Sequence, residues 1–177
     1  HVHSYGVALA ALGHHDSALV QYRRVLAVDP GFYQAHNNMG IALRALERPQ
    51  AAVAQYRQAL AQNPQFADAH YNLANTLADL HNLAAAELHY RRALELNPHY
   101  AKAHNNLGKL LGSKGMLPAA MAHFTRALEL KPTYAEAHFN IGMAHLVQGR
   151  LEAAITHYRL AVEGKPENPV FLQKLSL

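Results

Sequence analysis

The stretch Ala103-His104-Asn105-Asn106-Leu107-Gly108 decides the fold, because near-copies of it recur at a fixed distance along the chain. Equivalent stretches occur at 35–40, 69–74 and 137–142, so the copies follow one another in equal steps. The asparagine in the fourth place of the stretch keeps the same register in every copy, and we call these four residues the Asn ladder: Asn38, Asn72, Asn106 and Asn140. Such a strict period is typical of a repeat protein, in which each unit buries its apolar face against its neighbours.

The composition permits a packed core and requires neither a membrane nor a nucleic acid. Half of the 177 residues are apolar, and the net charge is a modest +4 with the 14 histidines neutral. The sequence has no run of about 18 apolar residues and no signal-peptide pattern, so we expect a cytoplasmic protein by default. It also lacks cysteine, which excludes disulfides and thiol chemistry. The chain begins inside a repeat without an initiating methionine, so we expect it to be part of a longer protein.

Proline marks the end of each repeat. Five prolines follow one another at equal intervals: Pro30, Pro64, Pro98, Pro132 and Pro166. The residue before a proline is biased out of the helical region, so each proline is expected to end a helix. The sequence therefore predicts a domain at 1–168 made of five repeats, at 1–32, 33–66, 67–100, 101–134 and 135–168.

Within each repeat, two separate segments have apolar residues at helical spacing. In 33–66, apolar side chains recur at helical intervals up to Leu46, and the pattern resumes at Ala52 after a break at Arg48-Pro49. In three repeats the break holds a glycine, which can end a helix with a positive φ: Gly13, Gly115 and Gly149. Pro49 and Pro118 can begin the second helix, where no N–H is needed. Each repeat is therefore predicted to be a helical hairpin.

Small residues and aromatics recur at positions that suggest close helix packing. Gly40 and Ala52 are expected to face each other inside one hairpin, with Tyr56 filling the space beyond them. A larger side chain at Gly40 would then overpack the hairpin by roughly 1–3 kcal/mol.

These positions together resemble the tetratricopeptide repeat, a helix–turn–helix unit of about 34 residues. The repeat at 101–134 matches the family pattern of small residues, aromatic and proline at Gly108, Ala120, Phe124, Ala127 and Pro132. The chain departs from the family at the fourth position of the repeat, where the usual bulky aromatic is replaced by His36, His70, His104 and His138. The resemblance implies an all-α fold, a right-handed α-solenoid superhelix of stacked hairpins. It also implies a concave peptide-binding groove lined by the first helices, in a family that seldom catalyses reactions.

By the same resemblance, the Asn ladder faces the groove. An asparagine amide has both donors and an acceptor, so a row of them can pair with successive peptide groups of an extended ligand. The ladder is similar to that of the superhelix of O-linked N-acetylglucosamine transferases, which holds substrate backbone. The alternative is that asparagine is simply common at this position of the repeat, and Ser4 interrupts the row in the first repeat.

Positions next to the ladder differ between repeats and would determine specificity. Aromatic rings could pack against ligand side chains, lysines could pair with carboxylates, and amides could bind polar groups. The alternative is that these residues are merely variable and exposed. The candidates are Asn37, Tyr71, Asn75, Lys102, Asn105, Lys109 and Phe139.

The histidine row at the fourth position of the repeat invites a metal hypothesis, which the spacing disfavours. No two of the 14 histidines have the i, i+3 or i, i+4 spacing that a helical metal pair requires. We therefore expect these histidines to pack with one ring nitrogen hydrogen-bonded, and we expect no metal and no cofactor. Protonation of partly buried histidines would loosen the array in acid, which is a hypothesis.

Arginines recur in the second half of the repeats, among them Arg57, Arg92 and Arg126. We expect them near the C-terminal ends of the second helices, where they would complement the helix dipole and be offset by Glu95 and Glu129. Nucleic-acid binding is not expected, because this face lacks interleaved aromatic residues.

The C-terminal segment 169–177 predicts the start of a further or capping helix. Asn168 can cap a helix that begins at Pro169. Its apolar residues suggest that more chain follows or that this end self-associates or packs on a partner: Val170, Phe171, Leu172, Leu175 and Leu177.

The function expected from these features is a non-catalytic protein-interaction scaffold that binds an extended peptide or partner segment through the Asn ladder. The alternative is the substrate-recruiting arm of a larger enzyme, similar to the O-linked N-acetylglucosamine transferases, with its catalytic domain elsewhere.

Overall fold

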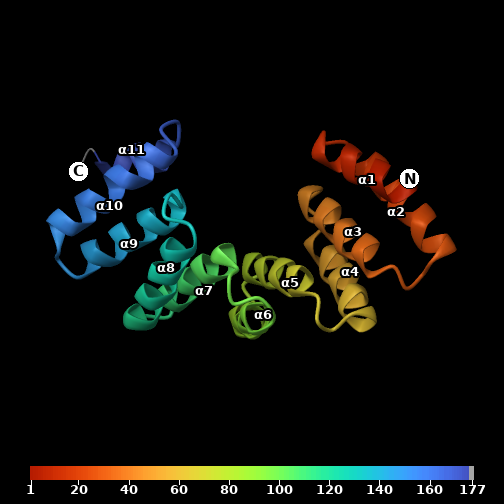
Figure 1. Cartoon of the computed structure of the whole chain (residues 1–177), viewed down its shortest axis with the longest axis horizontal. Coiled ribbons are helices and arrows are strands. Elements are labelled where there is room, and N and C mark those ends of the chain that lie inside the picture. Colours follow the sequence, from red (N-terminus) through yellow and green to blue (C-terminus); the bar gives the residue numbers. More distant parts are fainter. Residues whose placement is uncertain (176–177) are drawn as a thin grey trace. The chain divides into compact units, whose positions relative to one another are not determined.

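The computed structural model describes residues 1–175, and every regular element in that range is an α-helix (Figure 1). The chain divides into two compact units, His1–Asn97 with α1 to α6, and Pro98 onward with α7 to α11. The helices are α1 (Val2–Ala11), α2 (His15–Val28), α3 (Tyr33–Ala45), α4 (Pro49–Gln62), α5 (Ala67–Asp79), α6 (Leu83–Leu96), α7 (Ala101–Ser113), α8 (Leu117–Leu130), α9 (Ala135–Val147), α10 (Leu151–Gly164) and α11 (Pro169–Leu175).

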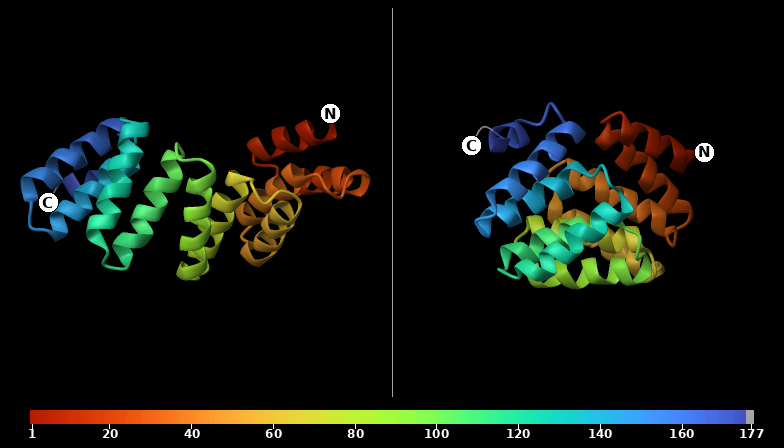
Figure 2. Two further views of the ribbon diagram at one scale, coloured as in Figure 1. Left: turned by 60° about the horizontal axis from the view of Figure 1, so that its bottom comes forward. Right: turned by 60° about the vertical axis from the view of Figure 1, so that its left-hand side comes forward.

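Consecutive helices pair into hairpins, as the double helical period predicts. In the first unit α1 packs on α2, α3 on α4 and α5 on α6, and each hairpin also contacts the next. In the second unit α7–α8 and α9–α10 stack in the same way, as the left panel of Figure 2 shows. Each unit is therefore an all-α solenoid of stacked hairpins, and the predicted fold class is confirmed. No helix within residues 1–175 is long and apolar enough to cross a membrane.

The turn inside each hairpin contains one residue with positive φ. The predicted glycines have this conformation, with φ of 81° at Gly13, 76° at Gly115 and 72° at Gly149. In the other two hairpins the same place is taken by Glu47, at 57°, and His81, at 59°. Two non-glycine residues therefore adopt the left-handed conformation, which costs them about 1–2 kcal/mol each.

Glycines on the first helices lie directly beneath an aromatic ring of the second. A Cβ at Gly40 would lie 2.5 Å from the Tyr56 ring, and one at Gly108 would lie 2.7 Å from the Phe124 ring. The Ala120 backbone oxygen would be 3.0 Å from the Gly108 Cβ, so the helices do approach closely. The three atoms nearest a Cβ at Gly40 all belong to Tyr56, and in the later hairpins the backbone oxygens of Ala120 and Ala154, which are equivalent to Ala52, also lie against the glycine.

The C-terminal helix α11 packs on the last hairpin through one aromatic residue. Asn168 caps it as predicted, since its Oδ1 accepts hydrogen bonds from Val170 N at 3.0 Å and Phe171 N at 3.3 Å. Phe171 is buried and stacks on Phe139 with ring centroids 4.7 Å apart. Phe171 is therefore not part of an exposed apolar end, which comprises Val170, Leu172 and Leu175. Leu177 lies outside the described residues.

Candidate peptide-binding surface

The four ladder asparagines lie on the first helices of their hairpins. Asn38 and Asn72 come from α3 and α5 of the first unit, and Asn106 and Asn140 from α7 and α9 of the second. All four are half-buried. Their neighbours Asn37 and Asn105 are buried, each only 4% exposed.

The buried asparagines link successive first helices through side-chain amides. In the first unit, Asn72 Nδ2 donates to Asn37 Oδ1 at 3.0 Å, and Asn37 Nδ2 donates to Asn38 Oδ1 at 3.3 Å. Two residues proposed to contact ligand, Asn37 and Asn72, are therefore hydrogen-bonded to each other. A buried amide needs such partners, because an unsatisfied one costs about 1–3 kcal/mol.

The second unit repeats this arrangement. Asn140 Nδ2 donates to Asn105 Oδ1 at 2.9 Å, and Asn105 Nδ2 donates to Asn106 Oδ1 at 3.2 Å. Within residues 1–175 the Oδ1 atoms of Asn72 and Asn140 accept no hydrogen bond. Each of these two side chains thus keeps its acceptor and one of its two N–H groups for other partners.

Asn72 also lines a pocket of about 440 Å³ between α3, α4 and α5. The Arg44–Asp79 ion pair, with an N–O distance of 2.7 Å, forms part of its wall. Ile41 supplies an apolar surface that is 43% exposed. The side chains of Asn72, of a charged pair and of an exposed apolar residue therefore line the same pocket.

The remaining predicted residues differ in how far they are engaged. Asn75 accepts a hydrogen bond from the Tyr90 hydroxyl at 2.7 Å, and Tyr71 packs against the Tyr90 ring with centroids 6.2 Å apart. Phe139 contacts the rings of Tyr158 and Phe171, so α11 covers part of it. Lys102 and Lys109 are exposed on α7.

The histidine row has both ring nitrogens hydrogen-bonded, which corrects the expectation of one. In each case Nε2 lies 2.9–3.2 Å from the carbonyl of the proline that ends the preceding repeat. In three hairpins Nδ1 lies 2.9–3.1 Å from the Nδ1 of a second-helix histidine, in the pairs His70–His89, His104–His123 and His138–His157. In the second repeat the partner of His36 is Gln55.

The second-helix histidines His89, His123 and His157 are the site residues that sequence reasoning missed. They occupy equivalent positions in successive repeats, and each lies 19 positions after its partner. This constant offset is visible in the sequence, but each pair joins two helices, whereas the i, i+3 and i, i+4 spacings of a helical metal pair apply within one helix. Within residues 1–175, no group of three or more His, Cys, Asp or Glu is arranged to hold a metal ion.

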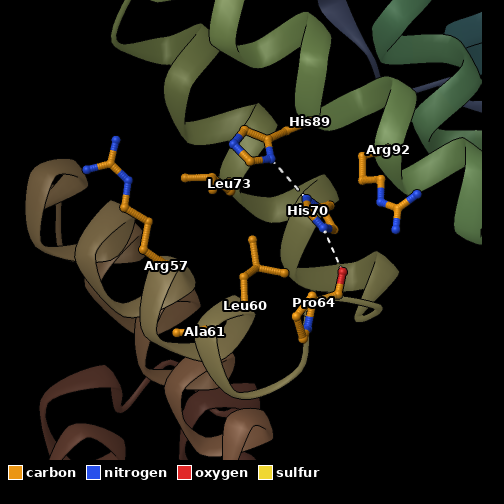
Figure 3. A pocket seen from close by; sticks show the side chains of 8 residues that line it. All are labelled: Arg57, Leu60, Ala61, Pro64, His70, Leu73, His89 and Arg92. Atoms are coloured by element: carbon orange, nitrogen blue, oxygen red, sulfur yellow. Dashed lines mark hydrogen bonds between the residues drawn. The ribbon is translucent and has the colours of Figure 1, made fainter.

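Each pair has a defined direction of proton donation. A carbonyl oxygen can only accept, so Nε2 of His70 carries the proton that it donates to Pro64. In a neutral His70, Nδ1 must then accept, which makes His89 the donor through its Nδ1. The two dashed lines in Figure 3 trace this chain from His89 through His70 to Pro64.

Burial disfavours the charged form of these histidines. It lowers the pKa of His89 to about 4, with further contributions from the charges of His70 and Arg57. Burial also lowers the pKa of His70, His104 and His157. His70, His89, His104 and His157 are therefore neutral near pH 7.

The arginines do not lie in the last turns of the second helices, because none of α2, α4, α6, α8 and α10 has a basic residue there. The expectation that these arginines complement the dipoles of the second helices is therefore wrong. The expected offset by glutamates is confirmed for Arg92 with Glu95 at 2.8 Å and Arg126 with Glu129 at 2.7 Å.

Stacked hairpins that repeat at a constant interval, with glycines of the first helices packed beneath aromatic rings of the second, define a helical repeat protein. The tetratricopeptide repeat family model matches residues 6–65, 37–101, 71–135 and 105–169, and the chain belongs to this family.

Solved structures of similar proteins have the same fold. MamA is 25% identical with a TM-score of 0.79, over 92% of this chain and 95% of its own. TTC0263, a thermophilic TPR protein of Thermus thermophilus, is 25% identical with a TM-score of 0.81, over 99% of this chain and 98% of its own. YrrB, described as a TPR protein with an unusual peptide-binding site, is 24% identical with a TM-score of 0.76, over 99% of this chain and 91% of its own. No curated protein matches this sequence significantly.

Proposed function

We propose that the chain is a non-catalytic scaffold that binds an extended segment of a partner protein along its first helices. The observation that carries the proposal is the open Oδ1 of Asn72 and of Asn140, each held by a donated hydrogen bond to a buried asparagine. An acceptor fixed in this way can receive a peptide N–H without first losing rotamer freedom. Membership of the tetratricopeptide repeat family, and the peptide-binding site named for the similar YrrB, support this role.

The pocket beside Asn72 indicates what kind of residue fits there. Ile41 offers apolar contact, and the exposed Arg44–Asp79 pair can exchange partners with a charged side chain. We expect a segment that pairs its backbone with Asn72 and places an apolar side chain on Ile41. On the second unit, exposed Lys102 and Lys109 would favour acidic residues in a segment bound there.

The probe for this proposal is a peptide selected against the chain from a displayed library of random unstructured peptides. The selected peptide is then synthesised without its display carrier. Changing Asn72 and Asn140 together to alanine should weaken its binding by about 1–3 kcal/mol in calorimetry. N-methylation of the peptide at the bound N–H groups removes the donors that we expect the two asparagines to accept. It should therefore weaken binding to the original chain. It should cause no further loss of affinity in the double variant, which already lacks both acceptors.

The control is Gln58→Ala, which removes an exposed amide from the second helix α4. This variant should bind the peptide like the original chain. Circular dichroism of each variant separates loss of binding from loss of fold, because both asparagines also stabilise the array. Equal affinity of the double variant and the control would refute backbone binding by the ladder.

The alternative role, as the substrate-recruiting arm of a glycosyltransferase-like enzyme, would use the same row of asparagines. It requires a nucleotide-sugar domain outside residues 1–177, which sequencing the full-length gene would reveal.

A further inference from the structure

Two exposed apolar side chains occupy equivalent positions on consecutive first helices of the first unit, and we call them the apolar row. Val7 on α1 is 42% exposed, and Ile41 on α3 is 43% exposed. Ile41 follows Asn38 by three residues, a spacing that makes the two side chains neighbours on one face of the helix. Ile41 also lines the same pocket as Asn72. The apolar row therefore runs beside the Asn ladder.

The packing of the first helices sets the interval at which either row repeats. Side chains join these helices directly. Asn38 Nδ2 lies 3.5 Å from His3 Nε2 between α3 and α1, and Asn72 Nδ2 donates to Asn37 Oδ1 at 3.0 Å between α5 and α3. The axes of helices in side-chain contact lie about 8–10 Å apart. A ligand that crosses the first helices therefore meets an equivalent position about every 8–10 Å.

The polyproline II conformation has a matching interval. It has three residues per turn and rises about 3.1 Å per residue, so the same side recurs about every 9.3 Å. A β-strand presents the same side at about 6.5 Å and again at about 13 Å, and both values miss the interval. An α-helix returns to the same face after seven residues, or about 10.5 Å, but its N–H groups are bonded internally. Polyproline II leaves its N–H groups free for an acceptor such as Asn72 Oδ1.

We propose that the first unit binds a segment in the polyproline II conformation that carries an apolar side chain at every third position. Two such side chains lie on Val7 and Ile41, and a peptide N–H pairs with Asn72. The residue that donates this N–H is not proline, because proline has no N–H. The equivalent place on α5 is the half-buried Asn75, so the preference for an apolar side chain ends there. This inference rests on the proposed function and specifies the conformation and sequence period of the ligand.

Three synthetic peptides test the proposal by calorimetry. The first repeats Leu-Pro-Gln four times, so that leucine recurs at every third position. The second has the same composition but repeats Leu-Pro-Leu-Gln-Pro-Gln twice, which breaks the period. The third replaces each proline of the first by glycine, which keeps the period and loosens the conformation. The first should bind, and the others should bind about fivefold or more weakly, because they lose the matched contacts or the preformed conformation.

The outcomes separate this inference from the proposed function. A first peptide that binds no more tightly than the second refutes the period, and one that binds no more tightly than the third refutes the conformation. Either result overturns the inference, as does failure of the first peptide to bind. The proposed function survives these results if a library-selected peptide still loses affinity when the ladder asparagines are changed to alanine.

Two variants locate the bound leucines. Val7→Ser and Ile41→Ser should each weaken the first peptide about fivefold, because a ligand would bury the roughly half of each side chain that is now exposed. The matched control is Val20→Ser on the second helix α2, since Val20 is 43% exposed, and it should have no effect. Equal affinity of all three variants refutes docking on the apolar row. Circular dichroism shows whether each variant keeps its fold.

NMR of the bound peptide gives an independent readout of its conformation. Backbone couplings and nuclear Overhauser contacts of the first peptide should be those of polyproline II. A bound peptide that is α-helical or forms a β-strand overturns the proposal, even if its affinity depends on Ile41.

Discussion

Nδ1 of His70 lies 2.9 Å from Nδ1 of His89, so at most one of these two nitrogens can carry a proton in the hydrogen bond. Because Nε2 of His70 is already a donor to Pro64, adding a proton to the pair charges a half-buried site between two helices. The same relationship recurs in two more hairpins.

Acid should therefore destabilise the array. The folded-state pKa of His70, His89, His104 and His157 is lowered below the ordinary 6.5, so the unfolded chain binds more protons as pH falls. This contribution to stability is fully present above pH 6.5 and is lost as pH falls toward the folded-state value, about 4 for His89. Thermal melting followed by circular dichroism between pH 7.5 and 5.5 should show Tm falling with pH.

The variant His89→Gln provides the matched comparison for this pH dependence. It should show a smaller fall in Tm over the same range, because glutamine keeps the hydrogen bond to His70 and does not titrate. A Tm that stays flat in the original chain would rule out the histidine pairs as the source of acid sensitivity.

Gly108→Ala should destabilise the second unit by roughly 1–3 kcal/mol, because its Cβ would lie 2.7 Å from the Phe124 ring. Gly112→Ala, on the same helix α7, is the control. Its Cβ would meet only the Ala120 Cβ at an ordinary 3.7 Å, so alanine should stabilise by about 0.5–1 kcal/mol. Urea unfolding of both variants measures the difference, and two variants of equal stability would contradict the close packing.

Glu47→Gly and His81→Gly should each stabilise the first unit by about 1 kcal/mol, because glycine adopts a positive φ without the Cβ clash. Both residues have this conformation in a turn where the other hairpins have glycine. The reverse change, Gly115→Ala, should destabilise the second unit although nothing lies within 4 Å of the added Cβ. The cost comes from the positive φ alone, which alanine adopts less readily than glycine. If Glu47→Gly lowered the urea midpoint, side-chain contacts of Glu47 would outweigh its backbone strain.

The repeat period was sufficient to predict the hairpins, because apolar spacing and proline positions act locally. The register of Gly13, Gly115 and Gly149 also identified the turn, but neither Glu47 nor His81 signals positive φ by residue type. Burial of Asn37 and Asn105 could not be predicted, because it depends on how closely successive first helices pack. The same position holds half-buried Tyr71 and Phe139 in the intervening repeats.

The hydrogen bond from Asn72 to Asn37 also decides which end of the Asn72 amide is held inside the array. The nitrogen end is fixed to its neighbour, and the oxygen end is left for whatever lies on the surface. Asn140 is held in the same way. An extended peptide is not the same read forward and backward, because its N–H and C=O groups change places when it is reversed. Amides that cannot flip would therefore accept a segment in one N-to-C direction in preference to the other.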